Sequence, residues 1–367
     1  MIPPPRPVWQ YPQVVYVGTG QPNQAINSPV PVFLSASRLQ RYKSRGENWP
    51  IVQSGAGWAG DSGAFTALVQ VGPNPIDKKT HPWWMHPEDY GAMWVRLADD
   101  IIWPDFVACQ DWPCEIAARE ATGKSTRWHI EATIENYLYL AAEFRMVPWL
   151  PVLQGWLPED YRHAAKLYEQ AGVDLSDGRL VGLGSICRRG SEREIAELVE
   201  HFTLDRGMRL HGFGVSKKAL SRIGWLLGSS DTQAWSYVSR AEHTRLPGCT
   251  HVGRDGQPND CRNCFRWAIA YREEMLAAIE DSRRNAAHPR YAQPSLWDGS
   301  DISAECDDAL ARAAEGIRRR APALSSVAFA PHRALTPAHP DASRDGPALP
   351  RAATPPTTQP PHQRRQP

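Results

Sequence analysis

Residues 149–156 read WLPVLQGW, a short apolar run that ends in a glutamine and a glycine. Two later stretches are also short, largely apolar and contain glycine near their ends: LVGLGS at residues 180–185 and RLHGFGV at residues 209–215. Helical patterns lie between such runs, so strands recur about every 20 to 40 residues, which is the spacing of βα units. The pattern predicts an α/β fold with a parallel sheet or barrel, and the chain is long enough for a TIM (β/α)8 barrel of about 250 residues.

Further strands and helices are expected around these stretches. Strands are predicted at residues 30–36 and 106–110, and a weaker strand ends near residue 230. Helices are predicted at residues 130–144, 159–170 and 195–202. The first of these helices has apolar residues at helical spacing, the second starts at a proline, and a Ser191–Glu194 capping box opens the third.

The chain is longer than one barrel of about 250 residues, since it has 367 residues. Residues 331–367 hold ten of the 33 prolines and few large apolar side chains, too few to bury a core. We therefore expect the ordered body to end near residue 285. The predicted organisation is a barrel at residues 1–245, a metal-binding segment and a following helix at 246–290, and a charged, Pro-rich, largely disordered tail at 291–367.

Composition excludes some classes of protein. The formal net charge is +1, so the chain is not one of the strongly basic nucleic-acid binders, although a local basic groove is compatible with this total. No apolar run reaches the roughly 18 residues of a membrane span, and the N-terminus is Pro-rich rather than signal-like. These features predict a soluble, cytoplasmic protein with no membrane partner.

Three of the seven cysteines lie close together in one polar segment. Nine residues separate Cys249 and His251 from Cys261 and Cys264, which gives a C-x-H…C-x-x-C pattern. Three thiolates and an imidazole complete a tetrahedral zinc site, which predicts structural Zn2+ with no open coordination position. The alternative is three reduced thiols beside an ordinary histidine.

Polar residues stand where several predicted strands end. Asp111 follows an apolar strand, Gln154 and Ser185 end the next two, and Asp231 ends a later one. Asp61 comes after the glycine-rich stretch SGAG at residues 54–57. In a barrel the carboxyl ends of the strands meet on the active-site face. Each residue taken alone is equally explained as a turn or a helix cap.

Taken together in order and spacing, these stretches resemble the tRNA-guanine transglycosylase superfamily, a group of zinc-bearing TIM barrels. The closest resemblance is to its DNA-acting branch, the DpdA-like deazapurine DNA-modification transglycosylases. The family's Asp-Ser-Gly-Gly-Phe is similar to DSGAF at residues 61–65, where Ala64 departs from the pattern. Its Val-Gln-Gly is similar to LQG at residues 153–155, and its Gly-Gly-Leu turn to LGS at residues 183–185, which departs at the end. The resemblance also covers HGFGV at residues 211–215 and spans roughly residues 30 to 285.

The resemblance implies a role for each matching residue. Asp231 is the expected nucleophile and Asp61 the expected general acid and base. Asp111 is expected to bind the Watson-Crick edge of guanine. The other residues implied in substrate binding are Gln154, Gly155, Gly184 and Ser185. A ring that stacks on the base is expected from Phe65, Trp156 or Trp112. The family also takes a zinc ligand beyond the helix that follows the cysteines, so His288 is the alternative to His251 as fourth ligand.

The expected reaction exchanges guanine in DNA for a 7-deazaguanine derivative of the 7-cyano-7-deazaguanine type, so DNA and the free deazaguanine base are the expected partners. A tRNA substrate is the runner-up. Two strand-end carboxylates in a barrel are also typical of glycoside hydrolases, and a non-catalytic zinc protein that binds nucleic acid is a third alternative. The sequence leaves open the inserted deazapurine, the sequence context, the need for helper proteins and the oligomeric state.

Overall fold

A computed structural model describes residues 13–26, 28–39, 56–64, 86–100, 103–186, 192–253 and 256–286. The chain divides into a unit of residues 1–294 and a second of residues 295–367, and all of these described residues lie in the first. Among them, no helix has both the length and the apolar character that crossing a lipid bilayer requires.

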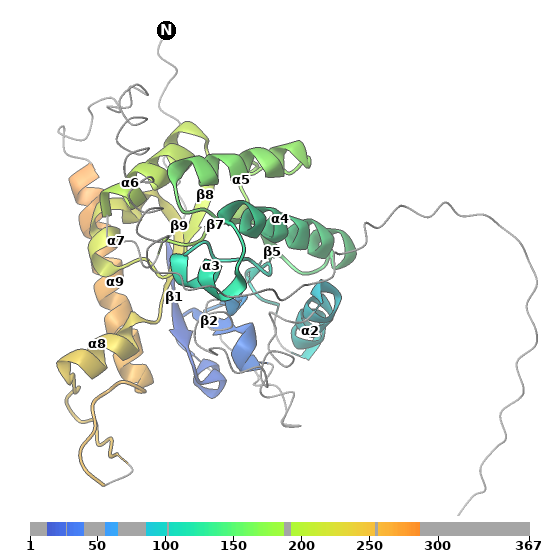
Figure 1. The fold of residues 1–367 in the computed structure, drawn as a ribbon. Coiled ribbons are helices and arrows are strands. Elements are labelled where there is room, and N and C mark those ends of the chain that lie inside the picture. Colours follow the sequence, from blue (N-terminus) through green and yellow to red (C-terminus); the bar gives the residue numbers. More distant parts are fainter. Residues whose placement is uncertain are drawn as a thin grey trace, which may run out of the picture. The chain divides into compact units, whose positions relative to one another are not determined.

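The centre of the first unit is a parallel sheet of nine strands that curls into a nearly closed barrel (Figure 1). The strand order is β5-β4-β3-β2-β1-β9-β8-β7-β6. The two end strands of this order, β5 and β6, are consecutive in the chain and only Pro151 separates them. The strands are β1 (Val14–Thr19), β2 (Val32–Ser35), β3 (Trp58–Asp61), β4 (Val107–Ala108), β5 (Trp149–Leu150), β6 (Val152–Leu153), β7 (Leu180–Leu183), β8 (Arg209–Gly212) and β9 (Leu227–Thr232).

Helices alternate with the strands and surround them (Figure 1). The helix α9 packs against α7 and β1, and α4 packs against α5. The α-helices are α2 (Pro87–Asp100), α3 (Ile116–Thr122), α4 (Thr126–Glu143), α5 (Pro158–Gln170), α6 (Glu192–Glu200), α7 (Lys217–Ile223), α8 (Ala234–Glu242) and α9 (Phe265–Ala286). Short 3-10 turns lie at Pro22–Ala25 and Gly224–Leu226, and a π-helical turn at His201–Asp205 follows α6.

Apolar side chains form two cores, because successive residues of a strand point to opposite faces of the sheet. Val15 and Val17 of β1 point outward into the large core between strands and helices. Between them, Tyr16 points into the barrel, where it packs with Phe33, Phe106 and other apolar residues. This filled interior makes the barrel a solid support, so a site can form only at its ends.

The structure confirms the expected parallel α/β barrel and most of the predicted elements. Each predicted strand lies on an observed one, although the observed strands are shorter, and the helices predicted at 130–144 and 159–170 are α4 and α5. The helix predicted at 195–202 overlaps α6, while Ser191 of its expected capping box lies outside the described residues. Two strands were not predicted, β1 and β3.

Candidate active site

The two acids expected to catalyse the exchange both lie in the wall of one cavity, at the carboxyl ends of the strands. Asp61 is the last residue of β3, and Asp231 is the penultimate residue of β9. Both line a cavity of about 570 Å³, together with Phe33, Phe213 and residues of α8. This volume falls within the range of about 300–1,000 Å³ that is typical of small-molecule sites.

Asp61 lies in an environment that favours its protonated form. Burial, followed by the nearby carboxylates of Asp111 and Asp231, raises the pKa of Asp61 to about 7. Hydrogen bonds from Ser35 and from the Gly63 amide, at 3.1 Å from Oδ2, oppose this rise. A carboxyl group that titrates near neutral pH is suited to both donating and accepting a proton.

Asp111 lies beside Asp61 and accepts two short hydrogen bonds. Ser62 Oγ donates to Oδ1 and Gln154 Nε2 donates to Oδ2, each at 2.5 Å. Burial raises the pKa of Asp111 to about 6, and these two hydrogen bonds lower it. Since a carboxylate has about four acceptor positions, Asp111 keeps acceptor capacity for a ligand.

The hydrogen-bond chain continues from Gln154 to residues that follow β7 and β4. Ser185 Oγ lies 2.6 Å from Gln154 Oε1 and 2.8 Å from Glu115 Oε2, and it accepts from the Cys114 amide. Ser185 holds this position in a left-handed conformation with φ of 54°, which is uncommon for a residue other than glycine. Loop residues after β4, β6 and β7 are thus tied into one polar network.

Two expected glycines have no room for a side chain. A Cβ on Gly184 would lie 2.4 Å from Gln154 Nε2, and a Cβ on Gly155 would lie 2.8 Å from the Tyr161 ring. The Gly184 amide donates to Leu153 O at 2.9 Å, so in this structure it serves the sheet rather than a base. Phe65 lies outside the described residues.

Asp231 accepts one hydrogen bond and has a buried imidazole nearby. The Gly214 amide donates to Oδ1 at 2.8 Å, and the ring of His211 lies with Nε2 3.5 Å from the same oxygen. Among the described residues, no donor contacts Oδ2. The cavity above Asp231 is bordered by Arg38 and, on α8, by Tyr237 and Arg240.

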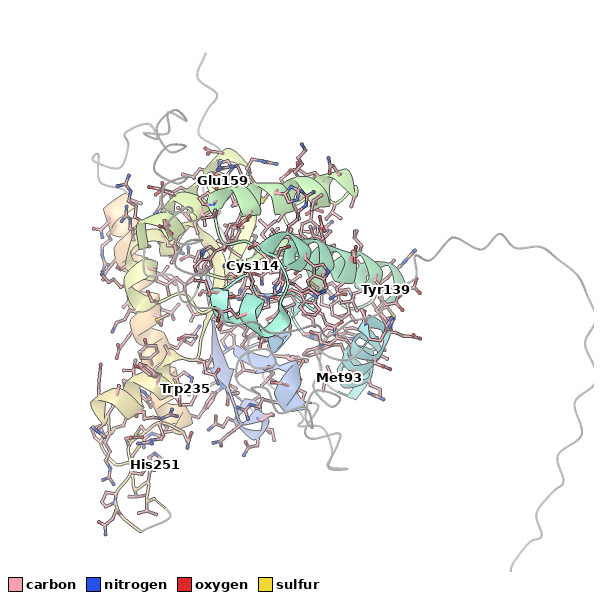
Figure 2. All side chains as sticks on the ribbon, in the orientation of Figure 1. Met93, Cys114, Tyr139, Glu159, Trp235 and His251 are labelled. Carbon is pink, nitrogen blue, oxygen red and sulfur yellow. The ribbon has the colours of Figure 1, made fainter. Side chains whose placement is uncertain are left out.

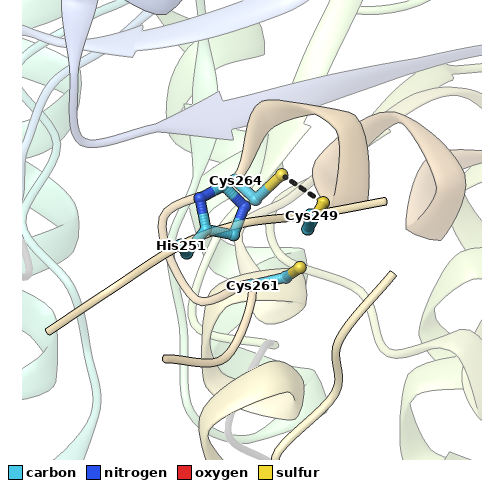
Figure 3. A group of neighbouring side chains, drawn as sticks. All are labelled: Cys249, His251, Cys261 and Cys264. Atoms are coloured by element: carbon cyan, nitrogen blue, oxygen red, sulfur yellow. Dashed lines mark hydrogen bonds between the residues drawn. The ribbon is translucent and has the colours of Figure 1, made fainter. Parts of the chain in front are cut away.

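The four expected metal ligands cluster in a loop outside the barrel. Figure 2 shows His251 in the loop that follows α8, and Figure 3 shows its ring beside the sulfurs of Cys249, Cys261 and Cys264. One ligand atom from each lies within 4.8 Å of all the others. His288, the alternative ligand, lies outside the described residues.

The cluster has the chemistry of a metal site. The sulfurs of Cys249 and Cys264 are 3.8 Å apart (Figure 3), which matches the edge of a tetrahedron with metal–sulfur bonds of about 2.3 Å. His251 Nε2 is buried and has no hydrogen-bond partner among the described residues. The three buried thiols and this unsatisfied nitrogen therefore could hold a metal ion.

Several residues of the site were not expected from the sequence. Ser62 binds Asp111, and Ser35 binds Asp61. Glu115 binds Ser185, and His211 lies close to Asp231. Ser35 ends β2, so the strand-end argument would have found it. The other contacts join residues far apart in sequence, and no local pattern indicates them.

A comparison with known protein families finds one that matches residues 12–314, described as DpdA: DeoxyPurine in DNA protein A. The match covers more than half of the 367 residues. A search of curated proteins finds no match.

Proposed function

Because the chain belongs to the DpdA family of transglycosylases that modify DNA with deazapurines, we propose that it exchanges guanine in DNA for a 7-deazaguanine derivative of the 7-cyano-7-deazaguanine type. In this proposal Asp231 is the nucleophile and Asp61 is the general acid and base. The observation that carries it is the position of both carboxylates in the wall of one cavity. A glycosyl transfer with a covalent intermediate needs a nucleophile for C1′ of the sugar and a proton donor for the departing base in the same site.

The first half-reaction removes guanine. An Asp231 carboxylate oxygen attacks C1′ of the nucleotide, the C1′–N9 bond breaks, and its electron pair leaves with the base. Asp61, whose pKa is about 7, donates the proton that neutralises the departing guanine. The sugar remains attached to Asp231 as an ester.

The second half-reaction reverses these steps with the incoming base. The nitrogen of the deazaguanine five-membered ring attacks C1′, the C1′–O bond to Asp231 breaks, and the carboxylate is restored. Asp61 accepts the proton from the incoming base. Proton and electron pair therefore balance over the whole exchange, with no other reactant.

The polar network beside the cavity fits a guanine-like base. Asp111 is the proposed acceptor for the two N–H groups of the Watson-Crick edge, a bidentate contact that adenine and pyrimidines cannot make. Gln154 is the proposed donor to the carbonyl oxygen of the base. In the absence of base the Gln154 amide donates to Asp111. When a base binds, the amide exchanges Asp111 for the carbonyl oxygen of the base. Gly155, Gly184 and Ser185 are proposed to shape this subsite.

The substrate base has to leave the DNA stack to reach the cavity, at a cost of a few kcal/mol. Arg38 and Arg240 border the cavity, which suits the phosphates of a polynucleotide strand. Tyr237, of which 71% is exposed, offers a ring at the same border.

We also propose that the metal is zinc and that its role is structural. Cys249, His251, Cys261 and Cys264 would supply all four positions of a tetrahedral site, which leaves none for water or substrate. The ion would join the loop before α9 to the start of that helix, since Cys264 directly precedes Phe265. As a finer description of the fold, we propose a TIM (β/α)8 barrel in which β5 and β6 are one strand interrupted at Pro151.

Nucleoside mass spectrometry tests the function. DNA and tRNA are digested from cells that carry the gene, lack it, or carry Asp231→Asn. We expect a deazaguanine nucleoside in DNA only with the wild-type gene. Its appearance in tRNA alone would replace DNA by tRNA as substrate, and an unchanged level with Asp231→Asn would refute the nucleophile.

A further inference from the structure

His211 is a fully buried histidine inside the barrel. It lies on β8, and none of its surface is exposed. Aromatic rings surround the imidazole, with Phe213 and Phe106 at centroid distances of 4.7 Å and 4.9 Å and Phe33 at 5.5 Å. Leucine or phenylalanine would fill this apolar space without the cost of burying a polar ring, so packing alone does not account for a histidine here.

The two ring nitrogens of His211 have different surroundings. Nδ1 lies 2.8 Å from Ser229 Oγ, and Nε2 is buried without a hydrogen-bond partner among the described residues. The nearest acidic oxygen is Asp231 Oδ1, 3.5 Å from Nε2. If the Ser229 hydroxyl donates to Nδ1, the neutral ring carries its proton on Nε2, the nitrogen that faces Asp231.

Strand register explains why these three residues meet. His211 pairs with Ser229 across β8 and β9, and Ser229 and Asp231 are two residues apart on β9. Residues at this spacing point to the same side of a strand. All three side chains therefore face the interior of the barrel, with Asp231 at the end that opens into the cavity.

We propose that His211 is a positioning residue for the exchange reaction. During the reaction its Nε2–H moves closer than the present 3.5 Å and joins the Gly214 amide in binding Asp231 Oδ1, which leaves Oδ2 as the oxygen that attacks C1′. The same hydrogen bond favours the carboxylate when the sugar ester breaks down, because an ionised acceptor binds a donor more strongly than an ester does. The inference rests on the proposed role of Asp231 as nucleophile.

The test compares two substitutions of His211 in the full-length protein. His211→Leu removes the donor and suits the apolar surroundings, whereas His211→Gln keeps an amide N–H. The assay follows transfer of isotope-labelled 7-cyano-7-deazaguanine into a guanine-containing oligodeoxynucleotide. We expect His211→Leu to lower kcat roughly tenfold to a hundredfold, the effect of one hydrogen bond to a charged group, with KM for the free base unchanged. His211→Gln should recover part of this loss.

A second variant and a melting curve separate positioning from packing. Ser229→Ala removes the group that orients the ring and should lower kcat less than His211→Leu does. The proposal is overturned if each variant loses kcat only in proportion to a fall in its melting temperature. It is also overturned if His211→Leu keeps wild-type kcat. If His211→Leu does not fold, His211→Gln and Ser229→Ala decide, and wild-type kcat in both overturns it.

Asp231→Asn distinguishes this inference from the proposed function. Base exchange by Asp231→Asn would refute the role of Asp231 as nucleophile, and with it the positioning role of His211. Loss of exchange in Asp231→Asn, combined with full kcat in the His211 variants, would refute His211 alone.

Discussion

Asp61 and Asp231 face the same cavity but differ in what surrounds them. Asp61 lies near two other carboxylates, which together with burial raise its pKa to about 7. Asp231 instead accepts a hydrogen bond from the Gly214 amide. Environments of this kind separate a proton donor from a nucleophile in one site.

The raised pKa of Asp61 predicts a pH-dependent cost in stability. The unfolded state loses this proton near pH 3.8 and the folded state near pH 7, so the cost is absent below pH 3.8, grows as the pH rises, and is complete above pH 7. Asp61→Asn removes it. We expect the variant to gain roughly 3 kcal/mol more in unfolding free energy at pH 8 than at pH 5, because two pH units separate pH 5 from the pKa and each contributes about 1.4 kcal/mol.

Urea denaturation at the two pH values measures this difference. Asp174→Asn is the control, because Asp174 is exposed and hydrogen bonds from Ser176 lower its pKa. That variant should show no gain that grows with pH. An equal gain for Asp61→Asn at pH 5 and pH 8 would contradict the raised pKa.

Gly184 predicts a defect in base binding. A Cβ there would come within 2.4–2.8 Å of the three atoms of the Gln154 amide group, so Gly184→Ala has to displace that amide from Asp111 and Ser185. We expect KM for the incoming base to rise about tenfold, which corresponds to about 1.4 kcal/mol, with a smaller change in kcat. Steady-state kinetics measures both, and an unchanged KM would show that Gln154 does not bind the base.

Single residues were predictable where a general rule of barrels applies. Asp111, Gln154, Ser185 and Asp231 were singled out because polar residues at strand ends share one face of a barrel, and Asp61 because it follows a glycine-rich stretch. The partners that tune them were not predictable. Ser62 reaches Asp111 across 49 positions and Ser185 reaches Glu115 across 70, and such contacts depend on the closed barrel.

At the scale of elements, the loop that contains Cys249, His251 and Cys261 is continuous with the helix α9. Besides the proposed ion, Arg272 donates to Val15 O at 2.8 Å and the Trp225 amide donates to Ser282 Oγ at 2.9 Å, which fastens α9 to the barrel. The ligand loop therefore lies between α8 and a helix that is part of the core. Loss of the metal should weaken the start of α9 first.

Cys261→Ser tests the metal site. We expect the variant to lose about one zinc ion per chain and to melt at a lower temperature, because metal binding is coupled to folding. Elemental analysis and calorimetry measure the two effects. His251→Ala should behave alike, whereas His288→Ala and Cys306→Ser are controls that should keep the metal. Full zinc content in Cys261→Ser would refute this ligand set.

Elements with strong local patterns were predictable, whereas β3, which lacks such a pattern, was not. In α4 the expected apolar face is buried at Ile130, Ile134 and Tyr137, and the Ser125 hydroxyl caps the start of the helix. The unpredicted β3 has four residues, WAGD, among them a glycine. A strand this short forms because two neighbouring strands pair with it, and that context is absent from the local sequence.

At the scale of the whole molecule, the barrel depends on one segment. Residues 149–153 pair with β4 through β5 and with β7 through β6, and the Pro151 carbonyl between them accepts from the Gly182 amide at 2.8 Å. The recurrence of βα units predicted a parallel sheet or barrel. The sequence did not indicate that ring closure would fall on either side of a proline, because closure depends on strand tilt and stagger.

The division of the chain predicts that the first unit folds alone. The unit of residues 1–294 contains all the described elements, and the composition of the tail offers little surface for a core. A chain that ends at Pro294 should keep the melting temperature of the full chain within a few degrees. A large drop measured by calorimetry would show that residues 295–367 contribute to the stability of this unit.

The covalent intermediate tests the whole account most directly. The protein is incubated with a guanine-containing oligodeoxynucleotide without incoming base, quenched in denaturant, digested and analysed by mass spectrometry. We predict a sugar–DNA adduct on the peptide that contains Asp231, with release of free guanine, and no adduct in Asp231→Asn. An adduct on another residue, or base exchange that proceeds in Asp231→Asn, would contradict the account.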